Sequence, residues 1–372
     1  MKGYFIVVKS EEKKQGKDGY DIKIEGQIKA FCEAGLNCKE IDFFYKKNKS
    51  VLEAFSTRLP FINSQPKFYL KDELYDADYI YMRRPFVCNI FLRKMFKKLK
   101  TINPNIKIIM EIPTYPYDDE FAQIKLGWAL LIKDKFNRKR LKGLVDRFAI
   151  LTDEKEIWGM PTIKFKNGID LDSIQKRIPI RFHNDDIHIC AVSTLQSWHG
   201  YERFIQGLHT YYQRDGKRKI ICHIVGEGPE KELYKHLINK YKLNDNFVFE
   251  GFKSGVELDH IYNICTLSLG SFGFYKIGLE MSANLKSRDT VARGVPMITG
   301  CKTDIFNKED FKFFLEFPNS NKELDISKII QFYDNIYRDG EDNVISDIRN
   351  YAKNTVDMSA CMKPVIDYIS KG

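Results

Sequence analysis

The most informative part of this sequence reads Gly278-Leu279-Glu280-Met281-Ser282-Ala283-Asn284-Leu285-Lys286-Ser287-Arg288-Asp289-Thr290-Val291-Ala292-Arg293-Gly294-Val295-Pro296. The pattern predicts a loop, a helix from about Asn284 to Arg293 and, after Gly294, a strand. Ordinary helices place Asp or Glu in the first turn, because the free N–H groups there are electropositive. This helix begins with Lys286 and Arg288 instead. Two added positive charges are unfavourable there unless an anion binds, so the segment predicts a phosphate or diphosphate site.

Neighbouring residues extend this prediction. Ser282 and Ala283 are small enough to let the backbone approach such a ligand closely. Asp289 directly follows Arg288, and a fixed carboxylate near a diphosphate can accept hydrogen bonds from both hydroxyls of a ribose. The segment therefore carries side chains suited to a nucleotide. In the alternative interpretation, the cations point to solvent and Asp289 only neutralises them.

Strand-like and helix-like stretches alternate along the rest of the chain, which is typical of parallel sheets flanked by helices. The expected strands are 4–8, 79–82, 107–111, 147–151, 187–192, 219–225, 247–249, 266–269 and 295–298. The expected fold class is α/β, with two doubly wound Rossmann-like domains that face each other across a ligand-binding cleft. We expect domains at 1–183 and 184–343, and a helical tail at 344–372 that packs back on the first domain.

Composition limits the class of protein. The 372 residues are 43% hydrophobic and 30% charged, with a mean hydropathy of −0.39, which excludes global disorder and allows two cores. No stretch approaches the roughly 20 apolar residues of a membrane-spanning helix, and the apolar run after Met1 is too short for a signal peptide. We therefore expect a cytoplasmic protein. The eight cysteines stand singly, without zinc-type spacing, and are expected to be reduced core residues.

Positive charge is concentrated in the first half, because residues 1–182 carry a net charge of +12 and the remainder −2. Two segments, 91–100 and 133–142, are especially basic. In the first, apolar residues recur at helical spacing, and the other face carries Arg93, Lys94, Lys97 and Lys98. Such a helix suits an anionic membrane surface, although a core-facing helix with a solvated basic face fits the same pattern. No nucleic-acid-binding motif accompanies the charge, so a nucleic-acid partner is not expected.

The segment 282–296 resembles the donor-binding stretch of bacterial family-4 retaining glycosyltransferases, which have the two-domain GT-B fold. In those proteins a Ser-Pro-Leu-Lys-x-Arg-Glu-Tyr-Leu-Ala-x-Gly-x-Pro pattern occupies this place. The resemblance implies that Lys286 and the backbone N–H groups at the helix start hold the diphosphate of a nucleotide sugar. It also implies that Asp289, a shorter carboxylate than the family's Glu, binds the ribose.

Further motifs of this family follow one another along about 300 residues. The donor-domain motifs are Val192-Ser193-Thr194 with Trp198-His199-Gly200-Tyr201-Glu202-Arg203, then Val225-Gly226-Glu227-Gly228-Pro229, then Phe249-Glu250-Gly251-Phe252 near the base. Those of the first domain are Gly26-Gln27-Ile28-Lys29-Ala30-Phe31, Glu111-Ile112-Pro113-Thr114-Tyr115-Pro116-Tyr117-Asp118 and Asn167-Gly168-Ile169-Asp170. Each motif is weak evidence alone, but the motifs follow one another in the same order as in the family, which makes the resemblance specific.

The chain departs from the family pattern at three places. The family's first acid, near the transferred sugar, would fall on Met281, and Glu280 stands one residue earlier. The family's Arg and Lys in the first donor-domain loop are replaced by Thr194 and His199, and His199 is either a diphosphate contact or a local cap. The acceptor-side histidine is missing. The polar residues there, read as acceptor contacts or as parts of a proline-rich turn, are Glu111, Tyr115, Tyr117 and Asp118.

The resemblance implies transfer of a sugar from a nucleotide sugar, expected to be UDP-linked, to a glycan or a polyprenyl-diphosphate-linked acceptor of a surface polymer such as a capsule. Retention of configuration is implied in the same way, and no metal or cofactor is expected. The expected catalytic residues are Glu280, Lys286 and Arg288, and the expected donor contacts are Ser193, Thr194, His199, Gly226, Phe252, Ser282, Asn284, Leu285 and Asp289. The alternatives are a non-catalytic glycosyltransferase-like partner or scaffold subunit and, less well supported, a nucleotide-sugar epimerase.

Overall fold

A computed structural model describes residues 1–11, 19–45, 66–180, 185–306 and 311–371. Its contacts divide the chain into two compact units, Met1–Lys166 with Cys361–Gly372 (unit 1) and Asn167–Ala360 (unit 2). The boundary predicted at 183/184 falls outside the described residues, and the contacts place the first division between Lys166 and Asn167. The boundary predicted at 343/344 lies inside unit 2.

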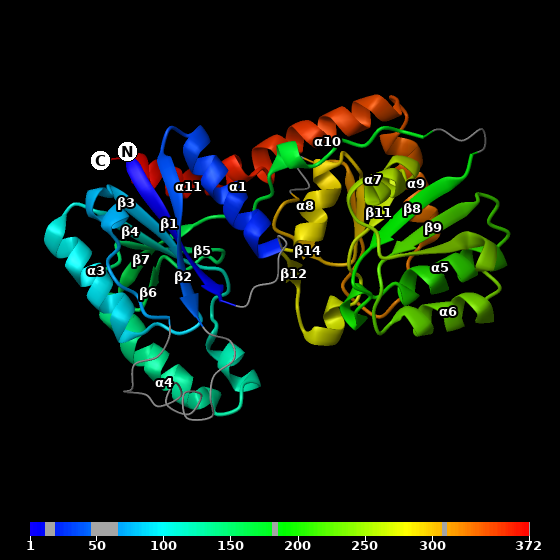
Figure 1. The fold of residues 1–372 in the computed structure, drawn as a ribbon. Helices are drawn as coiled ribbons and strands as arrows, with labels where there is room; N and C mark the ends of the chain where they lie inside the picture. Colours follow the sequence, from blue (N-terminus) through cyan, green and yellow to red (C-terminus); the bar gives the residue numbers. More distant parts are fainter. Residues whose placement is uncertain (12–18, 46–65, 181–184, 307–310, 372) are drawn as a thin grey trace. The chain divides into compact units, whose positions relative to one another are not determined.

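Unit 1 is built on a seven-stranded sheet with strand order β2-β1-β3-β4-β5-β7-β6, in which only the short β6 runs antiparallel to its neighbour. Its elements are β1 Lys2–Ser10, α1 Gly19–Glu33, β2 Asn37–Tyr45, η1 Asp72–Asp76, β3 Tyr79–Arg83, α3 Ile90–Ile102, β4 Lys107–Ile112, η2 Asp118–Gln123, α4 Gly127–Arg138, η3 Lys139–Leu141, β5 Arg147–Ile150, β6 Glu156–Ile157, β7 Met160–Lys164 and α11 Met358–Ser370, of which residues from Cys361 onward belong here (Figure 1). The central strands are apolar and buried on both faces, as parallel strands between helix layers must be.

Helix α3 packs its apolar residues into this core. Leu92, Met95, Phe96 and Leu99 are buried in the same cluster as the strand residues Ile80 and Ile108. The opposite face of α3 is exposed and carries the lysines named above. Because the apolar face of α3 is already buried, α3 cannot insert that face into a bilayer, and a membrane contact of its basic face stays a prediction.

Unit 2 contains a six-stranded, all-parallel sheet with order β10-β9-β8-β11-β13-β15, and a separate pair β12-β14. Its elements are η4 Leu171–Ser173, β8 Ile187–Val192, η5 Ser197–His199, α5 Glu202–Gln213, β9 Ile220–Val225, α6 Lys231–Lys240, η6 Asn244–Asn246, β10 Phe247–Gly251, α7 Gly255–Ile264, β11 Leu267–Leu269, η7 Phe274–Ile277, β12 Met281–Ser282, α8 Leu285–Ala292, β13 Met297–Thr299, β14 Lys302–Thr303, β15 Phe314–Glu316, α9 Ile326–Ile336 and α10 Glu341–Thr355. Helices α5 and α6 lie together on one face of the sheet (Figure 1). Two Rossmann-like units confirm the predicted fold class.

The predicted helical tail is interrupted. Helix α10 ends before Val356, and α11 starts at Met358. Between them the chain pairs with Ile169, whose N–H donates to the Val356 carbonyl at 2.9 Å and whose carbonyl accepts from the Met358 N–H at 2.8 Å. This pairing uses backbone groups that a continuous helix would need for itself. The tail is therefore two helices, and α10 belongs to unit 2.

Two sequence predictions concern membranes and cysteines. No helix within the described ranges is both long and apolar enough to span a bilayer. All eight cysteines are free thiols, and seven of them are buried as predicted. Cys32 is the exception, because its position on α1 leaves it exposed.

Candidate functional site

The start of helix α8 is open to a ligand. Asn284 caps the helix, because its Oδ1 accepts from the Ser287 N–H at 2.9 Å and its Nδ2 donates to Ser282 Oγ at 2.6 Å. The side chains of Ser282 and Asn284, both predicted donor contacts, therefore bond to each other. The N–H groups of Leu285 and Lys286 have no intrahelical acceptor by helix geometry. Leu285 is 47% exposed, so this end of the helix faces solvent.

The ammonium group of Lys286 is held by neutral partners. Its Nζ donates to the Tyr201 hydroxyl at 2.5 Å and to the Gly270 carbonyl at 3.3 Å, and lies 5.1 Å from the centroid of the Tyr201 ring. Burial lowers the pKa of Lys286 to about 7. Among the described residues no carboxylate pairs with this desolvated ammonium group, which lies beside the free N–H groups at the start of α8, and a phosphate group would provide the negative counter-charge.

His199 lies in the same cluster. Its Nδ1 accepts from the Gln196 N–H at 2.9 Å, so His199 forms the local cap, and its ring stacks on Tyr201 with centroids 5.8 Å apart. A diphosphate contact through its other ring nitrogen stays a prediction. Burial, together with the positive charge of Lys286, lowers the pKa of His199 to about 3. The imidazole is therefore neutral at pH 7 and carries its hydrogen on Nε2, which leaves Nε2 as a donor.

Glycines bring the loops after β8, β9 and β10 together. Gly226 has φ +119°, and a Cβ there would lie 1.9 Å from the Ser193 carbonyl oxygen, so no other residue fits. The Gly226 N–H donates to the Gly251 carbonyl at 2.7 Å. The predicted residues Ser193 and Gly226 thus lie close together at the carboxyl edge of the sheet. Thr194 is exposed there, and Phe252, directly after Gly251, is 77% exposed.

Asp289 lies one turn along α8 from Lys286, with 28% of its side chain exposed. Both of its oxygens accept from Arg293 Nε, at 3.1 and 3.2 Å, and Arg293 Nη1 also bonds to Asp259 at 2.5 Å. The carboxylate is therefore fixed in place and partly accessible. Arg293 was missed by the sequence analysis, although its spacing of four residues from Asp289 indicates such a pair.

Arg288 is a positioning residue in the structure. It has no exposed surface, and its guanidinium donates to the Asn167 carbonyl at 2.5 Å, the Asn284 carbonyl at 2.9 Å and Asp304 at 2.5 Å. These bonds fix the first residues of unit 2 to the start of α8. The prediction that Arg288 acts catalytically is not supported by this geometry, because the group faces Asp304 rather than solvent.

Glu280 is exposed beside β12, and Met281 is 57% exposed. The Glu280 carbonyl accepts from the Lys302 N–H at 3.2 Å, and this hydrogen bond is part of the pairing between strands β12 and β14. The carboxylate makes no hydrogen bond within the part of the chain that the structure describes. Its role near a sugar therefore stays a prediction.

On unit 1, Glu111 is fully buried at the end of β4. It accepts from Gln27 Nε2 and the Tyr81 hydroxyl, each at 2.8 Å, and pairs with Lys23 at 3.3 Å and Arg83 at 4.0 Å. Burial alone would raise the pKa of Glu111, but these cations and hydrogen bonds outweigh it and hold the pKa below its ordinary value. Glu111 is thus an ionised support for its neighbours and has no surface with which to contact an acceptor, contrary to the prediction.

The other predicted acceptor residues differ in accessibility. Tyr117 is buried, donates its hydroxyl to Asp134 at 2.7 Å and packs its ring 3.7 Å from the Arg84 guanidinium, so it is structural. Asp118 pairs with Arg138 at 2.6 Å, and this bond leads the lowering of its pKa. Tyr115 is partly exposed. Only Tyr115 and Asp118 therefore remain as candidate acceptor contacts.

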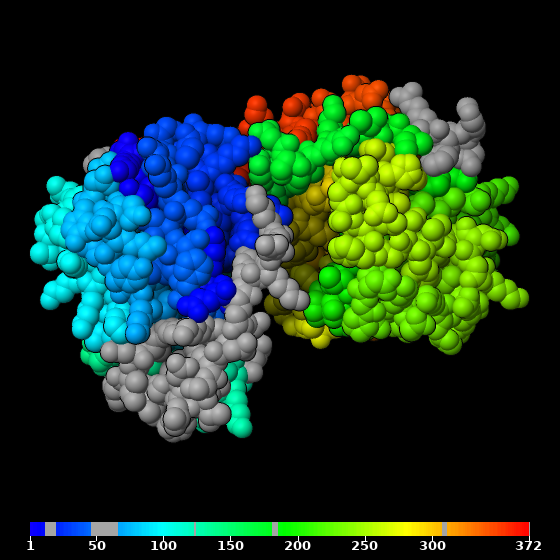
Figure 2. Space-filling model, viewed as in Figure 1, coloured from blue at the N-terminus to red at the C-terminus, as the bar shows by residue number. Residues whose placement is uncertain are grey.

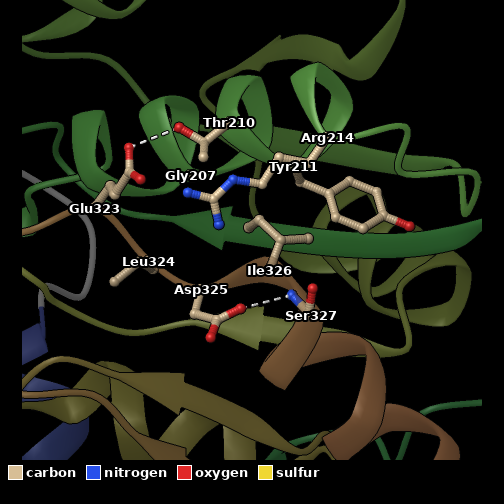
Figure 3. Close-up of a pocket in the computed structure, with 9 residues that line it drawn as sticks. All are labelled: Gly207, Thr210, Tyr211, Arg214, Glu323, Leu324, Asp325, Ile326 and Ser327. Atoms are coloured by element: carbon tan, nitrogen blue, oxygen red, sulfur yellow. Dashed lines mark hydrogen bonds between the residues drawn. The ribbon is translucent and has the colours of Figure 1, made fainter.

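A surface pocket of about 260 Å³ lies elsewhere on unit 2 (Figure 3). It lies between α5 and the segment that enters α9. Its two carboxylates are engaged locally, because Glu323 accepts from Thr210 at 2.8 Å and Asp325 caps α9 through the Ser327 N–H at 3.1 Å. None of the predicted site residues lines this pocket, and we do not place the functional site there.

A metal site was not expected. Within the described ranges, no group of three or more His, Cys, Asp or Glu side chains is arranged to hold a metal ion.

Comparison with known proteins supports the assignment of the fold. Residues 172–270 match the family model described as "Glycosyl transferases group 1", which covers the strands β8 to β11. No curated protein matches the chain. Structures that share the fold include HepE from Anabaena in complex with UDP (12% identity over 100% of both chains, TM-score 0.57) and a glycosyltransferase from Rickettsia africae (14% identity over 100% of this chain and 99% of that one, TM-score 0.56). The lipopolysaccharide outer core galactosyltransferase WaaB is similar at 13% identity over 99% of each chain, with a TM-score of 0.52. The fold is therefore GT-B.

Proposed function

We propose that this chain is a glycosyltransferase that transfers a sugar from a UDP-sugar, bound by unit 2, to an acceptor bound by unit 1. The observation that carries the proposal is the ammonium of Lys286, which lies on neutral partners beside the open start of α8. The match of residues 172–270 to a glycosyltransferase family model and the UDP in the HepE structure support it.

Stabilisation of the leaving group is the main contribution of unit 2 in this proposal. As the bond between sugar and phosphate breaks, negative charge develops on the terminal phosphate oxygen of UDP. Lys286, the free N–H groups at the start of α8 and His199 Nε2 can donate to that charge without a metal ion. Asp289, already fixed by Arg293, accepts from the ribose hydroxyls. The shifted Glu280 is assigned to the transferred sugar, and the reaction is proposed to retain configuration.

The proposed acceptor is a glycan or a polyprenyl-diphosphate-linked glycan of a surface polymer, reached from the cytoplasmic face of the membrane. The net charge of +12 on residues 1–182 favours an anionic surface or acceptor. The exposed face of α3 contributes Lys94, Lys97 and Lys98 to that charge. Tyr115 and Asp118 are the proposed acceptor contacts.

Calorimetric titration of UDP and GDP tests the donor site. We expect UDP to bind the wild-type protein, and Asp289→Ala to weaken that binding about ten- to a hundred-fold, because one hydrogen bond to a charged group contributes roughly 1.5–3 kcal/mol. Asp245→Ala, at an exposed aspartate elsewhere on unit 2, is the matched control. If neither nucleotide binds, the transferase proposal is wrong and the non-catalytic partner replaces it. Donor turnover without an acceptor-dependent product would instead favour an epimerase.

A further inference from the structure

Arg83, the last residue of β3, has a guanidinium group with unused hydrogen-bond donors. Its Nη1 is buried without a hydrogen-bond partner, and no hydrogen bond joins this side chain to another residue within the described ranges. The side chain keeps 17% of its surface exposed. A buried N–H group without an acceptor costs free energy, and native proteins satisfy nearly all such groups. Arg83 therefore lacks an acceptor that a bound ligand would provide.

Glu111 is paired with Arg83 only loosely. The two residues lie opposite each other on β4 and β3, and Glu111 Oε1 is 4.0 Å from Arg83 Nη1, which is too long for a hydrogen bond. Oε1 is nearer to Lys23 Nζ, at 3.3 Å, and Oε2 accepts from Gln27 and Tyr81. These donors occupy the carboxylate, so the guanidinium of Arg83 stays able to donate to another group.

Tyr20 orients the Arg83 guanidinium from one side. The guanidinium carbon lies 4.6 Å from the centroid of the Tyr20 ring, which is within the range of a cation–π contact. Such a contact orients the plane of the guanidinium but uses none of its N–H groups. Tyr20 lies in the first turn of α1, and side chains of this helix, in blue, are visible on the surface of unit 1 (Figure 2).

Arg83 lies at the position where open α/β sheets bind their ligands. The strand order of unit 1 reverses between β1 and β3, because β2 lies on one side of β1, whereas β3, β4 and β5 lie on the other (Figure 1). Arg83 ends β3, and α1 with Tyr20 follows β1, so both residues lie at the carboxyl edge beside this reversal. The proposed acceptor contacts Tyr115 and Asp118 follow the neighbouring strand β4 at the same edge.

We propose that Arg83 binds a carboxylate group of the acceptor, which is then an acidic sugar of the hexuronic acid type. The planar guanidinium presents parallel N–H groups that match the two oxygens of a carboxylate. A phosphate group matches the same geometry, but Glu111 is ionised and lies 4.0 Å from Arg83, so it would repel the second negative charge of a phosphate. A carboxylate carries one charge only. The inference rests on the proposed function, because that function makes the bound sugar an acceptor.

Saturation-transfer difference NMR with small sugars tests the proposal. Methyl glucuronide and its neutral counterpart methyl glucoside are titrated into the full chain, with UDP in excess to occupy the donor site. We expect the glucuronide to bind with a dissociation constant of about 1–10 mM, and the glucoside at least about ten-fold more weakly. Arg83→Gln should weaken glucuronide binding about ten-fold, because a charged hydrogen-bonded pair is lost.

Two further variants complete this experiment. Arg83→Lys keeps the charge but not the parallel donors, and should recover only part of the affinity for the glucuronide. Arg140→Gln changes an exposed arginine elsewhere on unit 1 and is the matched control, which should bind the glucuronide like the wild type. Thermal unfolding verifies that each variant is folded.

The wild-type protein alone can overturn the proposal. Equal binding of the two sugars, or no binding of the glucuronide, would show that no group of this protein selects a carboxylate. Equal glucuronide binding by wild type and Arg83→Gln would show that Arg83 is not the contact. Glucose 6-phosphate is the phosphate probe, and a tighter binding of this probe that Arg83→Gln abolishes would show that the ligand is a phosphate.

UDP titration of the wild-type protein separates this proposal from the proposed function. A preference for the glucuronide without UDP binding would show that the carboxylate site exists but that the transferase proposal is wrong. UDP binding without a preference for the glucuronide would overturn the carboxylate site and leave the donor site standing.

Discussion

Lys286 combines a stability cost with a proposed binding function. Its folded-state pKa of about 7 lies below the value of 10.5 for an unfolded lysine. Between these two values the unfolded chain binds the proton and the folded chain does not, so stability must rise with pH in that window. Desolvation of the protonated Lys286 side chain therefore destabilises the folded protein most strongly below pH 7.

Lys286→Met should remove this cost. We expect the variant to be more stable than the wild type at pH 6, on the order of 2 kcal/mol, and the wild type to recover about 2 kcal/mol relative to the variant between pH 6.5 and 8.5. Urea unfolding at the three pH values measures both quantities. A constant difference between the two proteins across this range would show that the ammonium is not desolvated.

His199 should make the fold sensitive to acid. Its folded-state pKa of about 3 lies far below the unfolded value of 6.5, so stability is full above pH 6.5 and is lost as the pH falls toward 3. We expect the wild type to lose about 2 kcal/mol more than His199→Gln between pH 7.5 and 5.0, since the amide cannot take up a proton. Urea unfolding at both pH values measures this difference. Parallel losses in the two proteins would contradict it.

Among the helices, α8 is where stability and binding can be separated. Asn284→Asp keeps a good cap, so the free energy of unfolding should change little, but it adds a negative charge at the proposed diphosphate position and should weaken UDP binding. Asn284→Ala should cost about 1 kcal/mol of stability with a smaller loss of affinity. Urea unfolding and calorimetry measure the two effects. Weaker UDP binding by the alanine variant than by the aspartate variant would contradict this account.

The sequence predicted the elements well where local periodicity determines them. The strand Ile187–Val192 has the predicted bounds, and α8 lies between its predicted end residues Asn284 and Arg293, which are its caps. The start of that helix also drew attention to Lys286, whose ammonium group the structure places on Tyr201 and Gly270, while its role in binding stays a prediction. The break between α10 and α11 could not be predicted, because it depends on a backbone pairing with distant Ile169.

Side-chain roles were harder to predict than elements. Arg288 and Glu111 have the residue types of a functional site, but each is buried by partners far away in the sequence, Asp304 for the former and Lys23 with Arg83 for the latter. Tyr201 was named only as part of a donor-domain motif and not as a contact of Lys286, yet its hydroxyl accepts from Lys286. A sequence pattern gives the face of a helix, but not which polar atom on that face meets a partner.

At the scale of the whole molecule, unit 1 is completed by the C-terminal end of the chain. Lys107 on β4 donates to the carbonyls of Tyr368 and Ile369 at 3.0 and 2.7 Å, and Met362 contacts Gln27. The residues from Cys361 onward therefore form part of unit 1, although 167–360 separate them from the rest of it.

A chain that ends after Ala360 should lose the order of unit 1 and keep unit 2. We expect proteases to degrade residues 1–166 rapidly while a fragment close to 167–360 persists, because the truncation exposes apolar surface on unit 1 only. UDP affinity should remain within about three-fold of the full chain. Limited proteolysis with mass spectrometry and calorimetry test this. Degradation of both units together would show that the two units do not fold independently.

The central claim is that Lys286 binds the diphosphate of a nucleotide, and proton uptake tests it most directly. UDP is titrated calorimetrically at pH 8 in two buffers that differ in ionisation enthalpy. With a pKa of about 7, most of Lys286 is deprotonated in the free protein, so binding of the anion should take up as much as about 0.9 proton per UDP. Lys286→Met should bind at least about ten-fold more weakly, without uptake. Equal affinity and no proton uptake in both proteins would contradict the claim.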